Sequence, residues 1–137
     1  MSFYRNQKKK SQTNNNRTED FGITRKVSLL LEYTLHQSSK KNIKLYRNTV
    51  YQQLIKVNVE ISKAITYANC SKDYINERIK YQNRVIANCD VMNMLINSIY
   101  SIHIIDSHTC ETWSKLVSDV KYMTIAWLKT TKAERNN

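Results

Sequence analysis

Apolar residues recur at helical spacing over most of the chain, and the clearest stretch runs from residue 43 to residue 68. Its apolar positions are separated by steps of three and four, which places them on one face of a helix packed against other helices. These positions are Ile43, Tyr46, Val50, Leu54, Val57, Ile61, Ala64 and Ala68. Similar spacing predicts three more helices, from about residue 21 to 37, from about 72 to 105 and from about 110 to 132.

The same periodicity indicates which residues of the other three helices face the core. In the first helix they are Val27, Leu30, Leu31, Thr34 and Leu35. In the third they are Ile75, Ile79, Val85 or Ile86, Cys89, Met92, Leu95 or Ile96, Ile99 and Ile102. In the fourth they are Trp113, Leu116, Val120, Met123 or Thr124, and Trp127.

Short polar segments separate the predicted helices. Residues 38–42 favour turns, and Asn42 is a candidate N-cap; Ser71 is a candidate cap for the third helix, and residues 106–109 supply a turn and cap for the fourth. The chain has no proline and one glycine, Gly22, which we expect to mark the start of the folded part. Four long helices with short connections predict an all-α, antiparallel up-down-up-down four-helix bundle.

The sequence predicts one domain preceded by a tail. Residues 1–20 are polar and basic without an apolar period, which predicts a flexible basic tail, and residues 21–137 form the bundle. The three cysteines form no CxxC pair, as expected of reduced thiols. Because no apolar segment has the length of a signal peptide or a membrane span, we expect a cytoplasmic protein without a membrane partner.

Charge adds a hypothesis about the partner. The chain carries 22 Lys and Arg against 11 Asp and Glu, a net charge of +11, and a polyanion would relieve the resulting repulsion. In the predicted topology, the end that holds both termini collects ten basic and four acidic residues, whereas the other end collects four and two. Without a recognisable motif for reading bases, we expect backbone-driven, salt-sensitive binding to nucleic acid.

Nine residues are the candidate contacts to nucleic acid or to a polymerase. They are Arg78, Lys80, Arg84, Lys129 and Lys132 at the end with the termini, and Lys40, Lys41, Lys44 and Arg47 at the other end. Tyr74, Tyr81 and Tyr122 are interspersed with basic residues and are candidates for stacking on unpaired bases. The alternative is that these charges only keep the protein soluble and that the tyrosines are ordinary edge residues of a bundle.

Catalytic and metal-binding patterns are missing from the sequence. A di-iron bundle needs Glu-x-x-His on two helices, and no such motif occurs; Glu32 and His36 alone make no site. His103 and His108 are expected to be exposed or capping residues, and Cys89 a small buried hydrophobe. We therefore expect no catalytic residues, no cofactor and no metal, and a protein that is not an enzyme.

Three stretches carry a resemblance to a known family. They are YTLHQSSKK at residues 33–41, ANCDVMNMLI at 87–96 and AWLK at 126–129. Over about residues 24 to 132 the chain resembles the accessory variability determinant of diversity-generating retroelements and the related four-helix bundles encoded by intervening sequences in 23S rRNA genes. Residues 1–20 lie outside the resemblance, and it assigns no individual binding residue.

The resemblance implies a small basic bundle that assembles into a barrel-shaped homopentamer. Such a protein binds the element's reverse transcriptase and its template RNA, supports error-prone copying of that RNA, and has no catalytic residues of its own. Two alternatives stay open. One is a structural or interaction bundle of the rRNA-intervening-sequence type without a polymerase partner, and the other is a helical antitoxin or a metal-binding bundle.

Overall fold

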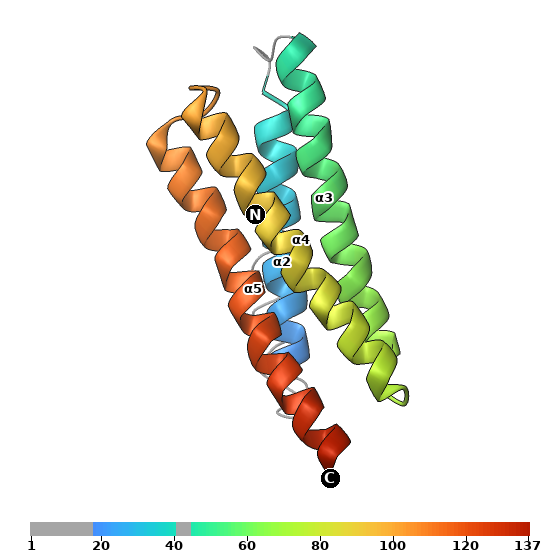
Figure 1. Ribbon diagram of the computed structural model, residues 1–137. Helices are drawn as coiled ribbons and strands as arrows, with labels where there is room; N and C mark the ends of the chain where they lie inside the picture. Colours follow the sequence, from blue (N-terminus) through green and yellow to red (C-terminus); the bar gives the residue numbers. More distant parts are fainter. Residues whose placement is uncertain (1–17, 41–44) are drawn as a thin grey trace.

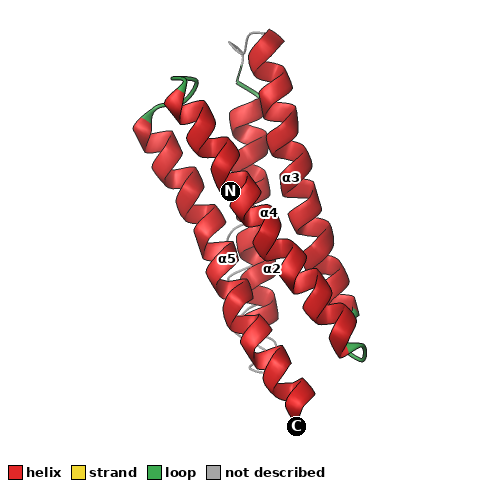
Figure 2. Cartoon of the chain, in the orientation of Figure 1, coloured by secondary structure: helices red, strands yellow, loops and turns green. Residues whose placement is uncertain are grey.

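The protein is a bundle of four long α-helices (Figure 1). The computed structural model describes residues 18–40 and 45–137, with side chains from residue 22 and, after the gap, from residue 48. The helices are α2 (Thr18–Ser38), α3 (Leu45–Cys70), α4 (Ile75–Ser101) and α5 (Ser107–Asn136). All regular structure in these two ranges is helical (Figure 2), so the predicted all-α class is confirmed. Most of the predicted tail lies outside the described residues.

Each helix packs against two neighbours in a closed ring. The packed pairs are α2 with α3, α3 with α4, α4 with α5, and α5 with α2. The ends of α2 and α4 lie at one end of the bundle, and the α3–α4 connection lies at the other with the start of α2 and the end of α5 (Figure 1). This is the predicted up-down-up-down arrangement, in which consecutive helices run antiparallel.

The core contains most of the residues that the periodicity selected. Leu54, Ile61, Ala64 and Ala68 of α3 are buried, while Val50 and Val57 are partly buried against the core. At three positions the periodicity left two neighbouring residues open, and the structure buries one of each pair. The buried residues are Val85, Ile96 and Thr124, whereas their neighbours Ile86, Leu95 and Met123 are only partly buried. Ile43 and the side chain of Tyr46 lie outside the described part of the chain.

Two predicted core residues are exposed. Ile102 is 65 % exposed because α4 has ended at Ser101, so the helical period no longer sets the direction of its side chain. Leu35 is 46 % exposed, since Leu30, Thr34 and Gln37 occupy the inward positions of α2. The predictions for these two residues were therefore wrong.

The helix ends follow the predicted caps only in part. Asp106 caps α5 as expected: its carboxylate accepts the backbone N–H of Thr109 at 2.7 Å, which lowers the pKa of Asp106. Ser71 does not cap α4, because its hydroxyl donates to the Tyr67 carbonyl at 2.7 Å, and Tyr74 precedes α4 without a side-chain cap. Gly22 does not mark a break either, since it lies inside α2.

Polar side chains tie three helices together inside the core. Trp113 Nε1 of α5 donates to Thr34 Oγ1 of α2 at 3.0 Å, and Thr34 Oγ1 donates to Asn58 Oδ1 of α3 at 2.8 Å. All three residues are fully buried. The Trp113 ring also packs against Tyr33 and Tyr51, with centroids 5.7 and 6.3 Å away. Because each hydrogen bond needs a partner on another helix, this network helps to fix which helices become neighbours.

Candidate nucleic-acid interface

Four of the five basic residues predicted at the end with the termini are exposed on adjacent helices. Lys80 and Arg84 lie on α4, and Lys129 and Lys132 lie on α5. The core positions of α4 in this region are Ile79, Gln82 and Val85, so residues 80 and 84 fall on the outer face of the helix. We call these four residues the basic face.

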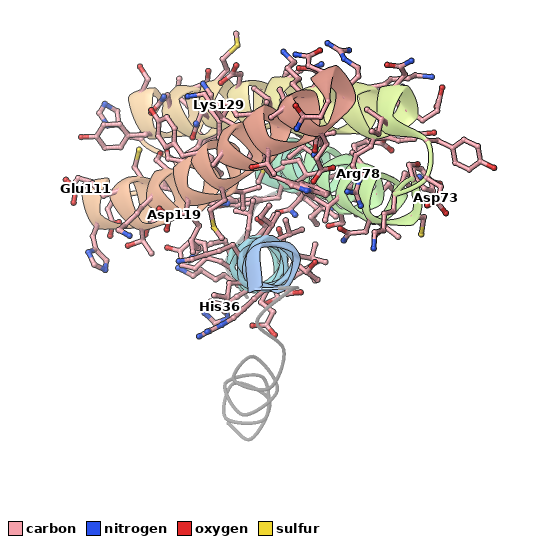
Figure 3. The ribbon with its side chains drawn as sticks, turned by 90° about the horizontal axis from the view of Figure 1, so that it is seen from below. His36, Asp73, Arg78, Glu111, Asp119 and Lys129 are labelled. Carbon is pink, nitrogen blue, oxygen red and sulfur yellow. The ribbon has the colours of Figure 1, made fainter. Side chains whose placement is uncertain are left out.

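Arg78 is not part of the basic face. It is 8 % exposed, its Nε donates to the Ala68 carbonyl at 3.0 Å, and its Cζ lies 5.2 Å from the centroid of the Trp127 ring. Viewed from the lower end, Arg78 lies among the helices, whereas Lys129 lies on the outer side of α5 (Figure 3). The guanidinium thus joins α3, α4 and α5 within the fold, which argues against its predicted role as a phosphate contact.

The basic face takes no part in the ion pairs of the described residues. Within residues 22–40 and 48–137, the ion pairs include Lys26 with Asp119 at 3.2 Å, Lys63 with Glu60 at 3.5 Å and Lys121 with Asp90 at 2.7 Å. None of the four basic-face residues forms an ion pair with a described side chain. Their charge is therefore free to attract an external anion.

Two tyrosines pair beside the basic face. The rings of Tyr67 on α3 and Tyr81 on α4 have centroids 5.3 Å apart and are tilted by 51°. Arg84 Cζ lies 5.4 Å and Lys80 Nζ lies 5.8 Å from the centroid of the Tyr81 ring. Tyr81 is partly buried, whereas Tyr67 is 47 % exposed. We call Tyr67 and Tyr81 the tyrosine pair.

Sequence reasoning selected Tyr81 but missed Tyr67. Tyr67 lies one turn before the end of α3 and Tyr81 lies in the second turn of α4, so antiparallel packing across the short α3–α4 connection brings them together. That register is the signal that could have identified the pair. Tyr74 and Tyr122, the other predicted stacking residues, are both exposed.

The predicted contacts at the opposite end are only partly described. Lys40 is exposed just after α2, and Lys41 and Lys44 lie outside the described residues. Arg47 falls in the first turn of α3, where the structure describes the backbone but not the side chain. These four residues remain predictions.

Nowhere in the described ranges do three His, Cys, Asp or Glu side chains cluster as a metal site would require. Cys89 is buried, and burial raises the pKa of its thiol to about 12, so it is protonated at neutral pH. His103 and His108 are exposed, as expected.

No described helix is both long enough and apolar enough to span a membrane. Comparisons of the chain with protein-family models, with curated proteins and with solved structures found no match. Any functional conclusion must therefore come from the chemistry of the basic face, the tyrosine pair and the sequence resemblance.

Proposed function

We propose that this protein is a non-catalytic nucleic-acid-binding adaptor that holds a reverse transcriptase and its template RNA together. The observation that carries the proposal is the basic face: four exposed Lys and Arg side chains on adjacent helices, without ion pairs to described residues. The polymerase partner and the role in mutagenic reverse transcription come from the resemblance to the accessory variability determinant.

Binding at the basic face is electrostatic. Each Lys or Arg that neutralises a phosphate releases a condensed counterion, so the affinity falls as salt rises. Four contacts to single-stranded RNA predict a slope of about −3 for the logarithm of the binding constant against the logarithm of salt concentration. Without a motif that reads base edges, sequence preference is weak.

Assembly of several copies would strengthen this binding. The outer face of α4 carries exposed apolar residues beyond the basic face, Val91 at 43 % and Met94 at 69 % exposed. Burying such residues between copies is favourable, and we propose this lateral face as the contact of a homo-oligomer, with the pentamer of the resembled family as its form. A closed ring would repeat the basic face around one axis and multiply its contacts with one RNA.

The decisive test compares two pairs of charge reversals in the full chain. Lys80→Glu/Lys129→Glu removes charge from the basic face, and Lys56→Glu/Lys115→Glu is the matched control, because both pairs replace exposed lysines and change the net charge equally. The first variant should lose binding to the template RNA and the reverse transcriptase at unchanged helicity. Equal binding by the two variants would remove the basic face from the proposal.

The same experiment addresses the alternative of an interaction bundle without a nucleic-acid or polymerase partner. In that case neither variant changes RNA binding, because the wild-type chain does not bind RNA at low salt. The exposed apolar residues of α4 would then account for the protein's contacts, and replacing Met94 with Glu would break the oligomer without any effect on nucleic acid.

A further inference from the structure

We infer that the tyrosine pair is a stacking site for an unpaired base, so that this end of the bundle takes a single-stranded segment of RNA. The inference rests on the proposed nucleic-acid binding and deepens it, because phosphate contacts alone do not distinguish a single strand from a duplex. The observation behind it is an exposed tyrosine whose ring packs against a second tyrosine, beside two cations that form no ion pair with a described residue.

Tyr67 is exposed, yet its ring is held by a contact with a neighbouring helix. The residue is 47 % exposed, and its ring packs against that of the partly buried Tyr81 with 5.3 Å between centroids. A side chain that is already ordered loses less conformational freedom when a ligand covers it. Tyr67 therefore offers a base a stacking surface at a lower entropic cost than an isolated exposed tyrosine does.

The charges beside the pair suit the flanking backbone of a stacked nucleotide. Arg84 and Lys80 lie 5.4 and 5.8 Å from the centroid of the Tyr81 ring, and neither forms an ion pair with a described residue. Both can leave the ring for a phosphate, and Arg84 can hold it with two parallel hydrogen bonds. One turn before Tyr67 on α3, Lys63 is paired only with Glu60 at 3.5 Å among the described residues.

Stacking requires a base that is out of a duplex. An A-form RNA helix keeps its bases stacked and displays phosphates and ribose hydroxyls, whereas single strands present base faces that stack on aromatic side chains. Aromatic residues interspersed with a positive surface are the arrangement by which proteins hold single strands without sequence preference. A duplex would use the basic face but would have no use for Tyr67.

The test measures fluorescence anisotropy with three labelled probes at one low salt concentration. The probes are an oligouridylate, an oligonucleotide of equal length without bases, and an RNA hairpin with a fully paired stem. The variants are Tyr67→Leu, which removes the ring, and Tyr67→Phe, which keeps it. Tyr100→Leu is the control, because Tyr100 is 43 % exposed, much like Tyr67, and lies near the opposite end of α4 from Tyr81.

Tyr67→Leu should weaken oligouridylate binding by roughly 5- to 150-fold, the range measured for loss of one stacked base, and should leave the two other probes unchanged. Tyr67→Phe and Tyr100→Leu should bind like the wild type. Equal loss with the base-free probe, or no loss with oligouridylate, would overturn the inference. If the wild-type chain binds none of the probes, the proposed function itself fails.

A second measurement uses the unaltered protein. Oligouridylate containing 5-bromouridine is crosslinked with ultraviolet light, and the attached residue is identified by mass spectrometry. Crosslinks should concentrate on Tyr67. Crosslinks spread over Tyr74 and Tyr122, with none on Tyr67, would contradict a stacking site at the tyrosine pair even if the wild-type chain binds RNA.

Discussion

Replacing Thr34 with valine should destabilise the bundle far more than the small change in side-chain volume suggests. Valine has nearly the shape of threonine, so the change creates no cavity and removes only the hydroxyl. That hydroxyl accepts from Trp113 Nε1 at 3.0 Å and donates to Asn58 Oδ1 at 2.8 Å, and both partners are fully buried. Among the described residues, neither Trp113 Nε1 nor Asn58 Oδ1 has another hydrogen-bond partner. The variant therefore buries an unpaired donor and an unpaired acceptor.

The magnitude follows from these two orphaned groups. Each buried polar group without a partner costs about 1–3 kcal/mol, so Thr34→Val should lower the free energy of unfolding by about 2–6 kcal/mol. At about 4 °C for each kcal/mol, the melting temperature should fall by about 8–24 °C. Thr34→Ser keeps the hydroxyl and is the control, with a loss of about 1 kcal/mol for the deleted methyl group.

Urea unfolding followed by circular dichroism measures these free energies. Adding Asn58→Leu to Thr34→Val should recover part of the lost free energy of unfolding. The second change removes the unpaired Oδ1 and also Nδ2, which has no hydrogen-bond partner among the described residues. A Thr34→Val protein within about 0.5 kcal/mol of the wild type would refute the network as a source of stability.

Three further predictions concern other parts of the bundle. His103, two residues after the end of α4, has a φ of 64°, a left-handed conformation that glycine adopts without strain. His103→Gly should therefore raise the unfolding free energy by about 1 kcal/mol in urea titrations, and a loss would contradict this. Arg78→Ala should lower the melting temperature, whereas Lys129→Ala should leave it unchanged in calorimetry, and the reverse order would refute the packing role of Arg78. Because burial raises the pKa of Cys89 from 9.0 to about 12, the unfolded chain loses that proton first, and stability should fall as pH rises from about 9 towards 12; a Cys89→Ala chain with the same pH profile would refute this.

The sequence predicts the helices and their order because apolar period and missing prolines act locally along each helix. It also selects Leu54, Ile61 and Trp113 for the core, since large apolar side chains on a common face have one favourable place to go. It fails where a polar residue stands on that face. Asn58 is buried because the Thr34 hydroxyl of α2 donates to its amide oxygen, and Arg78 is buried because the Ala68 carbonyl of α3 accepts from its Nε. A period along one helix does not reveal such partners on other helices.

The sequence likewise predicts one part of the candidate interface and misses another. Lys80, Arg84, Lys129 and Lys132 are correctly expected on the surface, because they alternate with core positions at helical spacing. The position of Tyr67 beside Tyr81 depends instead on the packing of α3 against α4. Charge totals therefore predict which kind of partner the bundle suits, whereas the place of contact needs the three-dimensional register of neighbouring helices.

The central claim is that this bundle is an adaptor for a reverse transcriptase and its template RNA. The experiment is co-purification of the chain with a reverse transcriptase of a diversity-generating retroelement and its template RNA, with the complex followed by light scattering at two salt concentrations. The account predicts a complex that contains several copies of this chain and whose affinity for RNA falls about 50-fold for a fourfold increase in salt. A lone oligomer that binds neither partner at low salt would contradict it.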